Sequence, residues 1–265
     1  MSERLHGKRI AVSPARAMVL ELLHHARKAP TLPVAKTINI AALLKPRKDA
    51  GVSWTALFLK AYSLTALEHP ELRRAFIPYP TKHFYEHPES SAAILVERQW
   101  QDENVVLGGR LRAPDQRSLH DIDAVLRGFR DDPVWNINYF RQTLRLGRLP
   151  AFVRRFVFWH SLYLSGAWRA KRFGTFMISS LGNLGVEQFH PLTFLTTYVT
   201  YGPISDAGDV TAKIIYDHRV LDGRTVARAL CTLEEMMNGP LLAELMDGID
   251  LARRAGRSTN LTNSY

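Results

Sequence analysis

The sequence predicts an α/β domain in which helices cover a mixed, mostly antiparallel sheet, as a two-layer sandwich. Segments with strand and helix periodicity alternate along the chain, and one stretch near residue 220 changes from strand to helix within a few positions. The chain has 265 residues, of which 46% are hydrophobic and 23% charged, enough for one large core. We therefore expect a single domain at residues 1–252 and a polar, basic tail at 253–265.

The clearest stretch is a predicted strand, turn and helix between residues 210 and 240. Apolar and polar residues alternate over 210–216, which is the period of a strand. From Thr225 onward, the apolar residues follow helical spacing, namely Val226, Leu230, Leu233 and Met237. Gly239 and Pro240 predict the end of that helix. His218, Asp222 and Gly223 fall in the turn between the two elements, where short exposed loops often carry function.

The remaining elements follow from caps and periodicity. Ser13 and Pro14 predict the start of a helix, as N-cap and first helical residue. The other predicted elements are a strand at 34–40, a helix at 53–68, two strands at 92–97 and 104–111, and a helix capped by Ser118.

Two motifs resemble those of a known family. Residues 216–223 read Tyr-Asp-His-Arg-Val-Leu-Asp-Gly, and residues 174–185 read Gly-Thr-Phe-Met-Ile-Ser-Ser-Leu-Gly-Asn-Leu-Gly. Both resemble signatures of the catalytic domain of the dihydrolipoyl acyltransferases of 2-oxo-acid dehydrogenase complexes. Weaker matches elsewhere extend the resemblance over most of the chain. It implies a fold like that of chloramphenicol acetyltransferase.

The residue types in the turn suit acyl transfer. A neutral imidazole can deprotonate an incoming thiol, hydroxyl or amine near neutral pH, so His218 is the candidate general base. The resemblance makes Ser179 the hydroxyl donor to the tetrahedral oxyanion. It gives Asp222 an orienting role, paired with an arginine near the N-terminus, for which Arg16 is the best positional match. Gly223 is expected to allow a close or positive-φ turn.

The resemblance also implies a cofactor and partners. We expect an acyl group to move from coenzyme A, or from a carrier-protein phosphopantetheine thioester, to an acceptor that the sequence leaves unidentified. It implies a homotrimer with active sites at subunit interfaces, where His218 faces Ser179 of the same or the adjoining subunit. Lipoyl and subunit-binding domains are missing from this sequence, which favours a stand-alone enzyme. The alternative is a non-catalytic trimeric scaffold or a membrane-surface binding module with the same fold.

Residues 140–173 depart from the family pattern. They are rich in aromatic and basic residues, which is typical of an interfacial helix. Three interpretations stay open: a helical hairpin that packs on the domain or on a neighbouring subunit, contact with an anionic membrane surface, or a lid over a lipid acyl chain. The membrane and lid interpretations predict an accessible apolar face, formed by Phe152, Phe156, Trp159 and Tyr163.

Composition argues against several other classes of function. The net charge is +10, yet the cations are scattered outside residues 141–172, so we predict no nucleic-acid partner. The chain has one cysteine, Cys231, and no cluster with metal-ligand spacing, so we predict no metal. It contains neither a signal peptide nor an apolar run of about 18 residues. We expect a cytoplasmic protein, with peripheral membrane contact as the alternative.

Overall fold

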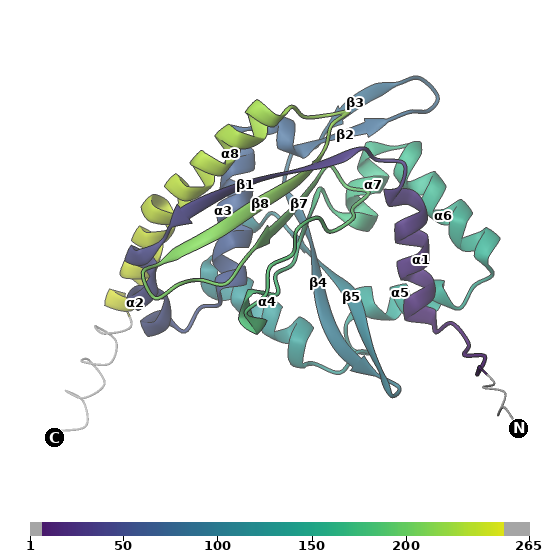
Figure 1. The fold of residues 1–265 in the computed structure, drawn as a ribbon, viewed down its shortest axis with the longest axis horizontal. Helices are drawn as coiled ribbons and strands as arrows, with labels where there is room; N and C mark the ends of the chain where they lie inside the picture. Colours follow the sequence, from purple (N-terminus) through teal and green to yellow (C-terminus); the bar gives the residue numbers. More distant parts are fainter. Residues whose placement is uncertain (1–6, 252–265) are drawn as a thin grey trace, which may run out of the picture.

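A computed structural model describes residues 7–251 of the protein, and its centre is a six-stranded mixed sheet (Figure 1). The strand order is β1-β8-β7-β6-β4-β5. The strands are β1 (Thr31–Asn39), β4 (Ser91–Trp100), β5 (Glu103–Arg112), β6 (Phe176–Ile178), β7 (Thr197–Tyr201) and β8 (Asp209–Asp217). Strand β6 runs parallel to both β4 and β7, and the other neighbours are antiparallel. A separate hairpin joins β2 (Arg74–Ile77) to β3 (His83–Glu86).

One face of the sheet carries the main core. Alternate strand residues such as Ile178, Val199 and Ile214 point to this face and are fully buried. The helices with buried residues in this core include α3 (Trp54–Glu68), α4 (Leu119–Asp131) and α8 (Gly223–Met236). Ser53 and Ser118 cap α3 and α4 with their hydroxyls, as expected at these positions.

The opposite face of the sheet has a second, smaller core. Its strand residues, which include Met177, Tyr198 and Ile215, alternate with those of the main core. Phe158 and Leu162 of α6 (Ala151–Tyr163) pack on them, and α1 (Pro14–Ala26) contributes partly buried residues. Helix α5 (Asn138–Gly147) lies against α1 and β5, and α7 (Gly166–Phe173) lies against α6. Residues 140–173 are therefore helical and pack on the domain.

Several shorter elements complete the described chain. These are the helix α2 (Ala41–Ala50) and the 3-10 turns η1 (Pro70–Arg73), η2 (Pro114–Gln116) and η3 (Gly182–Leu184). None of the helices within residues 7–251 is long and apolar enough to cross a bilayer.

The structure confirms the predicted α/β fold with a mixed sheet, and the predicted helices and strands lie within a few residues of their expected bounds. The expected helix end at Gly239-Pro240 is wrong. There the chain forms a π-helical turn, Met237–Leu241, and continues as helix over 242–251. The wider turn accommodates a proline that cannot donate a backbone hydrogen bond. The predicted tail at 253–265 lies outside the described residues.

Candidate active site

His218 lies in the turn that directly follows β8, as the sequence predicts. Its backbone N–H donates to the carbonyl oxygen of Pro30, 2.9 Å away, which ties the turn to the residue before β1. The imidazole Nδ1 lies 2.9 Å from the carbonyl oxygen of Leu221. A carbonyl oxygen only accepts hydrogen bonds, so Nδ1 carries the proton of the neutral ring and Nε2 keeps a free lone pair. The side chain is 47% exposed, so this ring is accessible to a substrate.

An ion pair with a buried carboxylate lies beside this histidine. The carboxylate of Asp217 is fully buried and accepts hydrogen bonds from the guanidinium of Arg219 at 2.6–3.2 Å. The backbone N–H of Asp217 donates to the carbonyl oxygen of Thr196, in the segment before β7. The guanidinium also stacks over the ring of Phe76, at 5.0 Å. The residues on both sides of His218 are therefore fixed by contacts to two other segments.

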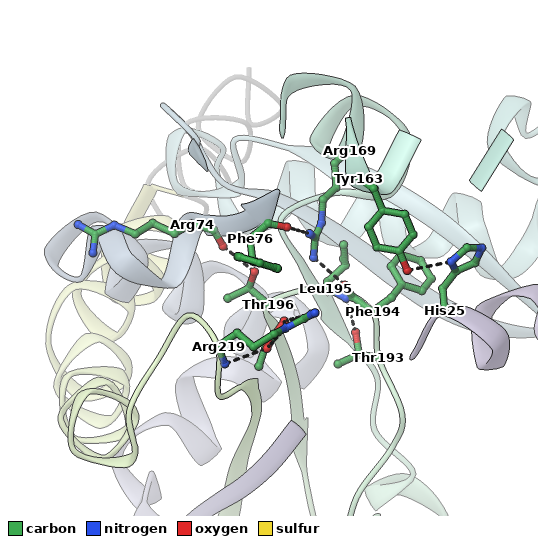
Figure 2. Close-up of polar contacts among 11 residues, drawn as sticks. His25, Arg74, Phe76, Tyr163, Arg169, Thr193, Phe194, Leu195, Thr196 and Arg219 are labelled. Atoms are coloured by element: carbon green, nitrogen blue, oxygen red, sulfur yellow. Dashed lines mark hydrogen bonds and ion pairs between the residues drawn. The ribbon is translucent and has the colours of Figure 1, made fainter. Parts of the chain in front are cut away.

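Arg169 of α7 is a second cation near the turn and, unlike Arg219, is buried. It donates to the carbonyl oxygens of Phe76 and Phe194, at 3.1 and 2.6 Å (Figure 2). Burial lowers the pKa of Arg169 to about 10, and the nearby carboxylate of Asp217 opposes that shift. Arg169 thus connects α7, which belongs to the segment that departs from the family pattern, to the strand segments around the turn.

Within one chain, Asp222 and Arg16 do not pair as expected. The Asp222 side chain is 85% exposed, and one of its carboxylate oxygens lies 3.8 Å from Nδ1 of His218. Arg16 instead lies 4.0 Å from a carboxylate oxygen of Glu103, on β5. The reason is the direction of α1, since Arg16 occupies its first turn whereas the chain reaches the His218 turn only at Pro30, after the helix ends.

Gly223 does not have the positive φ or the close packing that the sequence analysis expects. It begins α8 without a positive φ, and an added Cβ would lie 3.4 Å from the hydroxyl oxygen of Tyr216, an ordinary contact. The turn therefore does not require glycine for backbone freedom or for space.

Ser179 follows β6 directly and is half-buried. Its backbone N–H donates to the carbonyl oxygen of Val199, at 3.2 Å. Burial raises the pKa of the neighbouring Tyr198, and a side-chain hydrogen bond to Ser179 opposes that increase. The serine side chain therefore lies next to the buried Tyr198, on the sheet face that carries the second core.

The structure does not bring Ser179 and His218 together within one chain. Ile178 of β6, Val199 of β7 and Ile214 of β8 pair with one another and form a row across the sheet. Ser179 lies one residue past this row, toward one end of the sheet. Because β8 runs antiparallel to β7 and β6, His218 lies four residues past the row toward the opposite end. At about 3.3 Å per residue, the two are about 16 Å apart along the strands, in addition to the two strand spacings between β6 and β8.

No group of three metal-ligating side chains occurs among the described residues. A shallow hollow of about 470 Å³ lies along α8 and is lined by His69, Arg224, Arg228 and Cys231, among others. Its arginines could contact the phosphate groups of a cofactor that binds near the turn.

Comparison with known proteins identifies the fold. No protein-family model and no curated protein matches the chain in sequence. Among solved structures, the chain is similar to the dihydrolipoamide acetyltransferase of Azotobacter vinelandii, with a TM-score of 0.65 and 19% identity over 91% of this chain and 94% of that one. That structure was studied for the catalytic roles of a serine, a histidine and an asparagine.

Two further solved structures have a similar fold. The cubic core of a pyruvate dehydrogenase complex gives a TM-score of 0.61 and 19% identity over 91% of this chain and 94% of that one. Chloramphenicol acetyltransferase gives a TM-score of 0.50 and 12% identity over 87% of this chain and 99% of that one. The fold is that of the dihydrolipoamide and chloramphenicol acetyltransferases. At these identities the likeness establishes the acetyltransferase fold of the chain, and its chemistry has to be argued from the site.

Sequence reasoning missed the buried support of the turn. The predicted site assigns no role to Asp217 and includes neither Arg169 nor Arg219. The adjacency of an aspartate and an arginine around His218 was a usable signal for an ion pair. Arg169 is 49 positions away in sequence from His218, so nothing local indicates that it packs near the turn.

Proposed function

We propose that this chain is an acyltransferase that uses His218 as a general base and takes its acyl group from coenzyme A or a carrier-protein phosphopantetheine thioester. The observation that carries the proposal is the hydrogen bonding and exposure of the His218 ring. Nδ1 is held by the carbonyl oxygen of Leu221, so the exposed Nε2 is the atom that can accept a proton. The acetyltransferase fold supports the reaction class.

The proposed reaction is a direct transfer. Nε2 of His218 takes the proton from the acceptor's thiol, hydroxyl or amine as the acceptor attacks the thioester carbonyl. A tetrahedral intermediate forms, and the hydroxyl of Ser179 donates to its oxyanion, a contact that can stabilise the transition state by about 3 kcal/mol. The carbon–sulfur bond then breaks, and the leaving thiolate takes the proton back from the imidazolium. No covalent acyl-enzyme is needed.

We propose that the complete site forms between copies in a homotrimer. His218 and Ser179 lie at different ends of the sheet within one chain, so His218 of one copy has to meet Ser179 of another. The loop that follows Ser179 exposes four large apolar side chains, which are Leu184, Val186, Phe189 and Leu192. Such a patch beside an incomplete site is typical of a subunit interface. The similar cubic core shows that this fold also forms assemblies.

The direct test is the His218→Ala variant. We expect its turnover with a panel of acyl-coenzyme A donors, measured as release of the free thiol, to fall by about a hundredfold or more. His160→Ala, which changes an exposed histidine on α6, is the matched control and should keep its rate. An unchanged rate in His218→Ala, in a preparation that is active and folded, contradicts the mechanism.

One observation favours the alternative of a non-catalytic scaffold. Asp222, which the family resemblance pairs with an arginine, is exposed and has no arginine partner among the described residues. A scaffold would form the same trimer but would release no thiol from any donor and would bind no coenzyme A in calorimetry. Binding of coenzyme A in calorimetry, together with turnover that depends on His218, excludes this alternative.

A further inference from the structure

Helix α6 carries aromatic side chains on the face that points away from the sheet. Phe152 is 75% exposed and Phe156 is 64% exposed, one turn apart on the same side. Trp168 of α7 is 52% exposed, and Tyr79, in the connection between β2 and β3, is 48% exposed. The buried side of α6 is formed by other residues, Phe158 and Leu162. The exposed rings are therefore not required to hold the helix on the domain.

These rings form one continuous surface. From Tyr79 to Trp159 the ring centres are 5.9 Å apart, and from Trp159 to Phe156 they are 6.4 Å apart. His160 links Phe156 to Trp168, at 6.3 and 6.2 Å. We call this surface the α6 face, and it consists of Tyr79, Phe152, Phe156, Trp159, His160 and Trp168. Figure 1 shows α6 at the right-hand margin of the molecule.

The charge around the α6 face has one sign. No aspartate or glutamate occurs between Asp132 and Glu187, and all formally charged residues in that stretch are arginine or lysine. Lys171 lies 5.6 Å from the ring centre of Trp168, at the edge of the face, and Arg172 is exposed beside it. Glu21 of α1, an acidic residue in contact with α6, is buried against Arg154 and Arg155. The surface presented to a partner is thus aromatic and positively charged.

We propose that the α6 face docks the protein on an anionic lipid surface. Aromatic rings partition into the boundary between headgroups and acyl chains, and flanking cations are attracted by anionic headgroups. A second copy of the chain is a poorer occupant, because a symmetric contact through α6 and α7 would bring like charges together, and residues 133–186 contain no carboxylate to compensate them. This inference goes beyond the proposed acyl transfer, and its test requires no activity.

The test is co-sedimentation with vesicles. At low salt we expect the protein to bind vesicles of phosphatidylcholine mixed with phosphatidylglycerol and not vesicles of phosphatidylcholine alone, and added salt should release it. Lys171→Gln with Arg172→Gln should weaken binding about fivefold for each charge removed. Phe152→Ser with Phe156→Ser should weaken binding by about tenfold or more, because two rings leave the lipid boundary.

Matched controls change similar residues on other surfaces. Arg224→Gln with Arg228→Gln removes two exposed cations from α8, which packs on the opposite face of the sheet. Val106→Ser removes an exposed apolar side chain from β5. Both controls should bind the mixed vesicles as the unmodified protein does. Equal binding to the two kinds of vesicle, no binding to either, or equal loss in the controls overturns the proposal. So does a change of mass in light scattering caused by the two serine substitutions, which would make the α6 face a contact between copies.

Discussion

Side chains around the His218 turn differ in how their charges are stabilised. Asp222 is exposed, so water stabilises its carboxylate. Asp217 is fully buried, so its charge depends on Arg219 and on the field of Arg169. A buried charge that loses its partner costs far more than an exposed one. The stability of the turn should therefore depend on Asp217 and Arg219, while Asp222 should affect catalysis alone.

The first residue-scale prediction concerns this pair. Arg219→Met leaves the Asp217 carboxylate buried without its hydrogen-bonded partner, so we expect unfolding to become about 3 kcal/mol easier. Urea denaturation measures the change. Arg130→Gln breaks the exposed pair with Asp131 and should leave the free energy of unfolding nearly unchanged, because water already solvates both charges. Similar losses in the two variants would show that the Asp217 pair is not a special support of the turn.

The second residue-scale prediction concerns pH. Burial, with nearby cations as lesser causes, lowers the pKa of His25 to about 4. Between the ordinary histidine pKa of about 6.5 and this value, the unfolded chain binds a proton that the folded chain does not. The free energy of unfolding should therefore fall as the pH is lowered through that window.

His25→Gln should have a shallower dependence than the unmodified protein in urea titrations between pH 7 and pH 4. Part of the slope should remain in this variant, because burial also lowers the pKa of His87 to about 4. Parallel stability curves for the two proteins would mean that His25 does not contribute.

At the scale of elements, one face of α6 packs on the domain and the other face is exposed to solvent. Leu162 is fully buried in the second core, beside Met177 of β6, whereas Phe152 on the same helix is mostly exposed. Tyr163, which was expected on the exposed face, instead packs against the second core, and its hydroxyl lies 3.0 Å from Nδ1 of His25 on α1. The helix is thus held by both apolar and polar contacts, and its exposed rings are free for a partner.

The element-scale prediction separates these two faces. Leu162→Ala removes a fully buried side chain and leaves a cavity, so it should reduce the free energy of unfolding by about 2–5 kcal/mol. Phe152→Ala should change it by no more than about 0.5 kcal/mol, because the ring makes little contact with the domain. Calorimetry of both variants gives the comparison. A small effect of Leu162→Ala would mean that α6 is only loosely attached.

At the scale of the whole molecule, the register of the sheet decides how far apart the two proposed site residues lie. It separates Ser179 from His218 by about 16 Å along the strands, so a single chain holds the two halves of the proposed site without joining them. In the proposed homotrimer, each copy would give its histidine to one neighbour and take a serine from the other.

The corresponding prediction uses mixed assemblies. Ser179→Ala and His218→Ala homotrimers should each be nearly inactive, but subunits exchanged after mild denaturation should recover about a quarter of the sites, since some interfaces combine an intact serine with an intact histidine. The thiol-release assay measures recovery, and light scattering should give a trimer mass throughout. No recovery from mixtures that have demonstrably exchanged, or full activity of a monomer, contradicts the shared site.

The sequence by itself determined the elements and the position of the histidine. Strand and helix periods over 210–237, the serine caps of α3 and α4, and the glycine-rich motif at 174–185 are local signals, and each describes what neighbours along the chain do. They were sufficient to predict a mixed α/β fold, and they placed His218 at the end of a strand.

The tertiary structure decided which distant residues meet. Arg16 matched the expected arginine by position, yet the direction of α1 carries it to Glu103. Arg169 gave no local signal, yet the packing of α7 places it beside the turn. The distance between Ser179 and His218 depends on strand order and register, which are set by the packing of both faces of the sheet. These contacts depend on how the elements pack in three dimensions, which periodicity along one chain does not record.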